Sequence, residues 1–325
     1  MTNSSEIKQI IDIFGQEDNF LLTAHQDPDG DSIGSLIGLA LYLESLGKKI
    51  IIYNEGRLPQ KYRFLDPDNR IHFTVRQPDF KPAVAVILEC PEYSRIGFVK
   101  ELITDEMVIV NIDHHPRNAH YGKINYIDES ACAVAEILYR IIKTSGHKIT
   151  PRIAEAFYTA IASDTGRFKF TNTNSDCFNT AAELTKAGAN PKIIADKIFS
   201  SYSAGTMKLL GHLLQTLELH ANGQICILKL RLDDLVKYGV PIEETEGIID
   251  YSLAIAGVKV GILFKEKSER TVKVGLRSQN GINIAKYAMS KGGGGHANAA
   301  GFSIDSAFDE AIRQTVTGVA EYLNG

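Results

Sequence analysis

A histidine and three carboxylates are concentrated near the start of the chain, in the string HQDPDGDSIGS. They are His25, Asp27, Asp29 and Asp31. Carboxylates this close together repel one another unless a cation neutralises them. Imidazole combined with carboxylate suits Mn, Zn or Fe better than Ca. An EF-hand would need glycine at position 32 and glutamate at position 38, where the chain has serine and glycine. The segment predicts a divalent-metal site, and the alternative is a solvated acidic turn that caps the next helix.

A second group of metal-type side chains comes later in the first half. Asp113, His114 and His115 directly follow the apolar run at residues 107–112. A lone histidine is more often structural than a ligand. Two adjacent histidines behind an aspartate, at the end of a predicted buried strand, instead indicate binding of a metal or a phosphate.

Two single carboxylates complete the candidate metal ligands. Glu89 follows the apolar run at residues 83–88, and Asp164 closes an apolar helical segment. Either one alone is a weak signal, and a simple turn would account for Asp164 equally well. Three predicted buried strands, however, end at a metal-type residue: the first at His25, the second at Glu89 and the third at the Asp113–His115 segment. Ligands of open α/β sheets bind at the carboxyl ends of the strands.

The second half contains four consecutive glycines followed by a histidine. Such a run is costly in chain entropy, and a common reason for it is close approach of backbone N–H groups to an anion. The run is not a P-loop, because no Gly-Lys-Ser or Gly-Lys-Thr follows it. The alternative for the glycine run is a flexible linker, and the alternative for Arg277 is an ordinary surface arginine. The residues predicted to form an anion pocket are Gly293, Gly294, Gly295, His296, Arg277 and Ser278.

Hydrophobic periodicity predicts the elements that position these residues. Continuous apolar runs, typical of parallel strands buried on both faces, occupy residues 20–24, 50–53, 83–88 and 107–112. Helical spacing is present at residues 32–46, 131–144 and 151–162. The alternation of strands and helices predicts an α/β domain with a parallel sheet.

The character of the chain changes in its second half. Residues 175–217 have a mostly helical pattern. Strand-like runs then occur at 224–230, 258–265 and 271–277, with helices near 282–290 and 307–323. We therefore expect an α/β domain at residues 1–187, a helical linker at 188–217 and a smaller α+β domain at 218–325.

Composition excludes several classes of protein. The 325 residues include 35 Lys plus Arg and 39 Asp plus Glu, a formal net charge of −4. This balance argues against a protein that binds long duplex nucleic acid. No apolar run is long enough to span a bilayer, and the first residues lack a secretory signal. The four cysteines form no C-x-x-C pair, so we expect buried thiols in a cytoplasmic protein.

The motifs together resemble the DHH phosphoesterase superfamily. The resemblance is carried by His25-x3-Asp29-x-Asp31, by Asp113-His114-His115 and by the C-terminal GGGH string with AAG behind it. It covers nearly the whole chain. The order of the motifs matches the subfamily that has a DHH-associated C-terminal domain, and the length matches its nanoRNase and pAp-phosphatase type.

This resemblance implies two divalent ions, most often Mn²⁺, with Mg²⁺ or Co²⁺ as alternatives. His25 and Asp29 would hold one ion, and Asp31, His114 and Asp164 would hold the other. The family places an aspartate between the ions, where this chain has Glu89. The glutamate side chain is one methylene longer than that of aspartate. Glu89 would therefore bridge the ions from a shifted backbone, or it would change the spacing of the ions and the activity.

The remaining roles also come from the resemblance. Asp113 would orient the histidines, and His115 would face the scissile phosphate. The glycine loop with Arg277 and His296 would hold the far phosphate or the base of a substrate. Apart from the resemblance, an aromatic side chain soon after Asp164, such as Phe168 or Phe170, could stack a base, and core packing is the alternative role.

The function implied is hydrolysis of very short nucleotides to nucleoside monophosphates by a hydroxide that two metal ions activate. The expected substrates are short oligoribonucleotides, pApA and pAp, and the expected assembly is a homodimer. Two other functions stay open at this stage. One is a pyrophosphatase or exopolyphosphatase, and the other is a non-catalytic nucleotide sensor, which the unusual Glu89 would allow.

Overall fold

The chain folds into two units in a computed structural model that describes residues 4–76, 78–200, 202–245, 247–279 and 281–324. Internal contacts divide it into Met1–Ser201 and Tyr202–Gly325. This division falls inside the segment predicted as a helical linker. Of the helices in the described ranges, none combines the length and the apolar composition needed to cross a membrane. The four cysteines are buried and unpaired by disulfides.

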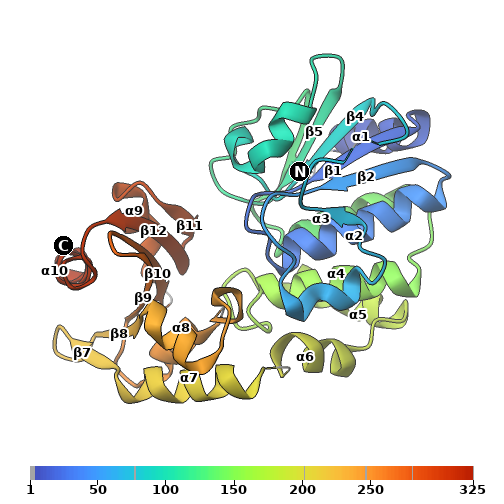
Figure 1. The fold of residues 1–325 in the computed structure, drawn as a ribbon. Coiled ribbons are helices and arrows are strands. Elements are labelled where there is room, and N and C mark those ends of the chain that lie inside the picture. The colour runs from blue at the N-terminus through green and yellow to red at the C-terminus, as the bar shows by residue number, and fades with distance from the viewer. Residues whose placement is uncertain (1–3, 77, 201, 246, 280, 325) are drawn as a thin grey trace. The chain divides into compact units, whose positions relative to one another are not determined.

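The N-terminal unit is built on a six-stranded sheet in which every neighbouring pair of strands is parallel (Figure 1). The strand order is β3-β2-β1-β4-β5-β6. The order therefore reverses between β1 and β4, where open α/β sheets bind their ligands. The strands are β1 (Asn19–Thr23), β2 (Lys49–Tyr53), β3 (Ile71–His72), β4 (Val84–Leu88), β5 (Val108–Asp113) and β6 (Ile124–Ile127).

Both faces of this sheet are buried, which explains the continuous apolar runs in the sequence. Alternate residues of β4 point to opposite faces: Val84 and Val86 join the cluster under the helices, and Ala85 and Ile87 join the cluster under η2 (Tyr93–Leu102). The helices of the unit are α1 (Ser4–Gln16), α2 (Gly30–Ser45), α3 (Val134–Thr144), α4 (Pro151–Asp164), α5 (Ser175–Lys186) and α6 (Pro191–Phe199), with a 3₁₀ helix η1 (Gln60–Leu65).

Close packing of α2 on α4 depends on glycine. A Cβ atom at Gly34 would lie 2.5 Å from the carbonyl oxygen of Ala156, and one at Gly30 would lie 2.2 Å from Oγ of Ser163. Without side chains at these positions, the start of α2 can approach the end of α4. This approach brings the Asp29 and Asp31 segment next to Asp164.

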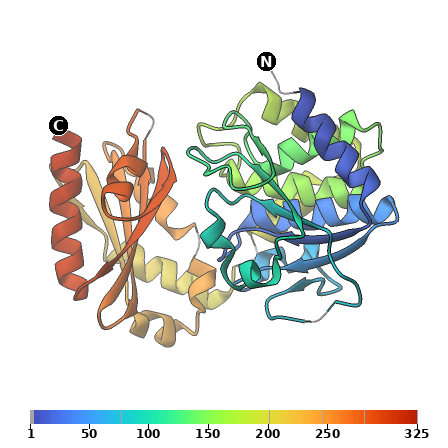
Figure 2. The same cartoon turned by 90° about the horizontal axis from the view of Figure 1, so that it is seen from above.

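The C-terminal unit is a mixed six-stranded sheet of order β11-β12-β10-β9-β8-β7, in which β8 and β9 are parallel. Figure 2 shows α10 lying along this sheet. Its strands are β7 (Glu218–His220), β8 (Ile225–Leu230), β9 (Val260–Ser268), β10 (Thr271–Ser278), β11 (Gly294–His296) and β12 (Ala299–Asp305). Its helices are α7 (Ala204–Gln215), α8 (Leu232–Tyr238), α9 (Ile284–Ser290) and α10 (Phe308–Asn324), with short 3₁₀ helices η3 (Ile242–Thr245) and η4 (Ile248–Ala254).

The predicted fold class is confirmed: a parallel α/β domain is followed, after helices, by a mixed α+β domain. Several elements were missed in the sequence. Helix α1 and the short strands β3, β6 and β7 lacked a strong signal. Strand β12 was missed because its sequence, AAGFSID, has few β-branched or aromatic residues.

Candidate metal centre

The predicted metal ligands of the first half converge at the carboxyl edge of the parallel sheet. His25 follows β1, Glu89 follows β4, and His114 follows β5. One group of ligand atoms, all within 4.8 Å of one another, comes from His25, Asp29 and Glu89, and a second comes from Asp31, Glu89 and His114. Glu89 belongs to both groups. Two ion positions with Glu89 between them would fit this arrangement.

The first group is held at the start of α2. Asp29 is the N-cap of the helix, and its Oδ1 accepts the backbone N–H of Ser32 at 3.0 Å. Nδ1 of His25 lies 2.7 Å from the carbonyl oxygen of Gln26, so Nδ1 carries the proton and Nε2 presents its lone pair. Nε2 lies 3.5 Å from Oε2 of Glu89. The imidazole is thus oriented as a ligand on the Glu89 side.

Glu89 occupies a backbone conformation that glutamate rarely adopts. Its φ is +50°, and the residue is 1% exposed. The hydroxyl of Ser32 donates a hydrogen bond of 2.5 Å to Oε2 and lies 3.1 Å from Nε2 of His25. Ser32 could not be predicted to take part, because a serine inside an acidic motif gives no separate signal in the sequence.

The second group is fixed by the start of α3 and by the loop before it. Oδ2 of Asp31 accepts the N–H of Val134 at 2.6 Å, and Oδ1 accepts the hydroxyl of Ser35 at 2.8 Å. Nδ1 of His114 lies 3.0 Å from the carbonyl oxygen of Ala131, which directs Nε2 into the cluster.

Asp164, at the end of α4, lies beside this second group. Its Oδ2 is 3.8 Å from Nε2 of His114 and accepts a hydrogen bond of 3.0 Å from Asn172. Asn172 was also missed, since nothing in its local sequence connects it with Asp164. The contact arises from the turn that follows α4.

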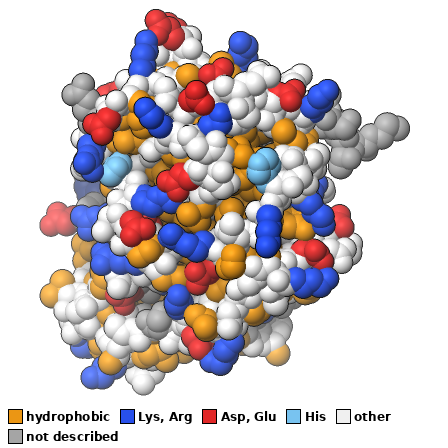
Figure 3. All heavy atoms as spheres, turned by 90° about the vertical axis from the view of Figure 1, so that its right-hand side faces the viewer, with side chains coloured by type: hydrophobic (Ala, Val, Ile, Leu, Met, Phe, Trp, Pro, Cys, Tyr) orange, Lys and Arg blue, Asp and Glu red, His pale blue; other side chains and the backbone are white. Residues whose placement is uncertain are grey.

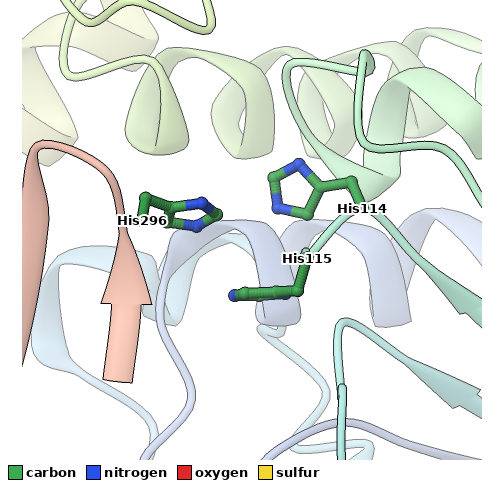
Figure 4. Close-up of side chains that lie close together, drawn as sticks. All are labelled: His114, His115 and His296. Carbon is green, nitrogen blue, oxygen red and sulfur yellow. The ribbon is translucent and has the colours of Figure 1, made fainter. Parts of the chain in front are cut away.

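Asp113 and His115 form a pair next to the ligands. Oδ1 of Asp113 lies 2.8 Å from Nδ1 of His115, and Oδ2 accepts a hydrogen bond of 2.7 Å from Asn118. Burial alone would raise the pKa of Asp113, but these partners outweigh it and lower the pKa to about 2. Figure 4 shows His114 and His115 on the loop after β5, and their rings meet edge to face at 79°.

If all were ionised, the buried carboxylates would carry more negative charge than their protein partners neutralise. Burial, followed by the charges of Asp29, Asp31 and Asp164, raises the pKa of Glu89 well above its usual value. Burial also raises the pKa of Asp164 to about 7, although His114 opposes this. A set of buried carboxylates and imidazoles with this excess of negative charge fits divalent cations.

These shifts predict how the stability of the metal-free protein depends on pH. The folded state keeps protons on Glu89 and Asp164 that the unfolded state releases above its carboxyl pKa of about 4. The free energy of unfolding should therefore fall as pH rises from about 5 to about 7, by on the order of a few kcal/mol. Urea unfolding in EDTA across this range measures the decline.

A matched variant tests the contribution of Asp164, whose charge also raises the pKa values of Glu89 and His114. His25, whose pKa burial lowers, contributes in the opposite direction near pH 6.5 in every variant. The decline should therefore be shallower in Asp164→Asn than in the unmodified chain. An equal slope in the two proteins would show that Asp164 is ionised throughout the range in the folded state.

The predicted substrate residues of the C-terminal unit gather at one end of its sheet. Arg277 of β10 is paired with Ala299 of β12, which is paired in turn with His296 of β11, labelled in Figure 4. Gly293 and Gly295 are required by the hairpin, because Cβ atoms there would lie 2.1 and 2.4 Å from carbonyl oxygens of β12. The glycine run is therefore a packed β-hairpin.

Ser278 and Phe168 make internal contacts. The hydroxyl of Ser278 donates to the carbonyl oxygen of Ile282 at 2.7 Å and accepts from Asn298 at 3.0 Å. Phe168 packs against the core of the N-terminal unit, and its ring stacks on Phe178 at 5.5 Å. Phe178, which is 56% exposed, presents the accessible aromatic surface of this pair.

Comparisons with known families match both units. Residues 19–161 match the DHH family, N-terminal domain, and residues 222–324 match the DHHA1 domain. Metal-type side chains at the carboxyl edge of a parallel sheet, followed by a DHHA1 domain, define a class of phosphoesterase. The chain belongs to the DHH phosphoesterase family and is a hydrolase of phosphoester bonds.

Similar proteins of known sequence cover almost the full length. The chain is 32% identical to the bifunctional oligoribonuclease and PAP phosphatase NrnA of Thermus thermophilus, covering 91% of this chain and 90% of that one. It is 28% identical to NrnA of Bacillus subtilis, covering 91% and 92%. The non-catalytic alternative is therefore wrong.

Solved structures share the fold. An exopolyphosphatase-related protein of Bacteroides fragilis superposes with a TM-score of 0.91 at 23% identity, covering 99% of this chain and 98% of that one. RecJ of Thermus thermophilus, solved in complex with Mn²⁺, superposes with a TM-score of 0.54 at 12% identity, covering 98% and 54%.

Proposed function

We propose that this protein hydrolyses short oligoribonucleotides, pApA and pAp to nucleoside monophosphates. The observation that carries the proposal is the pair of ligand groups that share Glu89 at the switch point of the sheet. Similarity to the NrnA proteins supports the substrate class. On the face of the molecule that Figure 3 shows, basic and acidic side chains are interspersed.

Two divalent ions fit the donor set of the N-terminal unit, with Mn²⁺ the preferred one. His25 and Asp29 would hold one ion, Asp31, His114 and Asp164 would hold the other, and Glu89 would contact both. Bound ions of this kind supply a nucleophile at neutral pH and neutralise charge on the phosphate.

The residues around these ligands prepare the site for reaction. The carboxylate of Asp31 accepts hydrogen bonds from two backbone N–H groups of α3, those of Val134 and Ala135. It is therefore already oriented and does not need to move when negative charge develops on the phosphate during the reaction. Asp113 stays ionised and holds the Nδ1 proton of His115. Nε2 of the neutral His115 ring can then take up the proton that the attacking water releases and transfer it to the leaving oxygen.

In the C-terminal unit, Arg277 and His296 would hold a terminal phosphate or base. Replacing His296 with alanine should raise KM for pApA by about tenfold and change kcat much less, because this side chain would act in binding. Steady-state kinetics with pApA measures KM and kcat separately, and His212→Ala serves as the control. A loss confined to kcat would contradict a binding role for His296.

A panel of substrates tests the proposed function. The purified chain is incubated with pAp, pApA, oligoribonucleotides of two to five residues, pyrophosphate and tripolyphosphate, in Mn²⁺, Mg²⁺ or Co²⁺. The products are separated by chromatography. We expect nucleoside monophosphates from the nucleotides. Turnover of pyrophosphate or tripolyphosphate alone would instead assign the protein as a pyrophosphatase or exopolyphosphatase.

A further inference from the structure

A cavity of about 560 Å³ lies at the outer edge of the parallel sheet. It is formed within the N-terminal unit by the loop after β2, by η1 and by the edge strand β3. None of the proposed metal ligands lines it. Its volume is in the range of pockets that bind small molecules.

Two arginines give the cavity a positive charge. Arg57 and Arg63 are both exposed, and neither makes a salt bridge within the described part of the chain. Asp66 also lines the cavity, but its two carboxylate oxygens accept the backbone N–H groups of Arg70 and Ile71 at 2.8 and 3.0 Å. Asp66 therefore fixes the turn before β3 and leaves the two guanidinium groups to an outside anion.

The rest of the lining is apolar and contains an aromatic ring. Ile71 is 5% exposed, and Leu58 and Phe73 pack partly buried against the core of the unit. Guanidinium groups bind phosphate through paired hydrogen bonds, and an aromatic side chain can stack a base. Inorganic phosphate would cover only the arginines. A ligand with both a phosphate and a planar ring would also cover the apolar surface.

We propose that this cavity is a second binding site, separate from the metal centre, for a nucleoside monophosphate. Residues next to the two arginines contact residues next to the proposed metal ligands at two points. A Cβ at Gly56, beside Arg57, would lie 2.9 Å from Cδ of Pro28, which precedes Asp29. The hydroxyl of Tyr62, beside Arg63, lies 2.8 Å from that of Ser163, which precedes Asp164. A nucleotide here would contact segments that pack directly against those preceding Asp29 and Asp164.

The test measures binding of AMP in EDTA by isothermal titration calorimetry. The double variant R57A/R63A should weaken binding at least about tenfold, and Phe73→Ala should weaken it severalfold. The matched control R270A/R313A removes two exposed arginines of the C-terminal unit and should leave the affinity unchanged. The thermal unfolding midpoint of each variant establishes that it is folded.

Adenosine and inorganic phosphate complete the experiment. Each should bind at least about tenfold more weakly than AMP, because each lacks one half of the ligand. Three results would overturn the proposal: no binding of AMP to the unmodified chain, equal binding by R57A/R63A, or phosphate binding as tight as that of AMP. Since the experiment needs neither metal nor turnover, failure of the proposed function would leave its outcome unaffected.

Discussion

Replacing both His114 and His115 with alanine should lower kcat for pApA by at least about a thousandfold while the fold is retained. His114 would be lost as a ligand of one ion, and His115 would be lost as the group that transfers a proton to the leaving oxygen. Steady-state rates in saturating Mn²⁺ measure the effect, and circular dichroism with urea unfolding monitors the fold.

The single variants separate the two roles. His114→Ala should weaken Mn²⁺ binding, which electron paramagnetic resonance of free Mn²⁺ can follow. His115→Ala should reduce kcat with Mn²⁺ affinity nearly unchanged, because His115 is not one of the proposed ligands. The double variant H212A/H220A removes two histidines of the C-terminal unit and serves as the control. Full activity in the His114 and His115 double variant would refute the proposed site.

Replacing Glu89 with alanine should lower kcat by about a hundredfold or more, because both ligand groups lose a shared member. Replacing it with aspartate should retain or increase activity. Aspartate tolerates a positive φ better than glutamate, and it is the residue that the family pattern has at this position. Loss of activity in Glu89→Asp would mean that the length of glutamate is required.

Ser32 provides a sharper test of the same position. Its hydroxyl donates to Oε2 of Glu89, which reaches it through the extra methylene. Ser32→Ala should therefore weaken Mn²⁺ binding about tenfold in the unmodified chain. In the Glu89→Asp background the effect should be small, because the shorter carboxylate is withdrawn from the hydroxyl. Additive effects in this double-mutant cycle would rule out coupling between the two side chains.

Local patterns were sufficient to predict where the metal-type residues lie in the fold. His25, Glu89 and His114 each follow a short apolar run, and such a run indicates a strand buried on both faces. Because parallel strands share one carboxyl edge, the sequence alone indicated that these residues would meet. The positions of α2 and α4 were predictable for the same reason, since helical periodicity is a local property.

Other features depended on contacts between distant segments. The order β3-β2-β1-β4-β5-β6 places β1 beside β4, and only this adjacency puts Glu89 in both ligand groups. The hydrogen bonds of Ser32 with Glu89 and of Asn172 with Asp164 also required the folded chain. In the C-terminal unit, the register of three strands brought Arg277 into line with His296.

Residue types and strand ends are encoded locally, so the sequence determined which side chains could carry the chemistry. Strand order and register are set by packing across the whole unit, so the tertiary structure decided how those side chains combine.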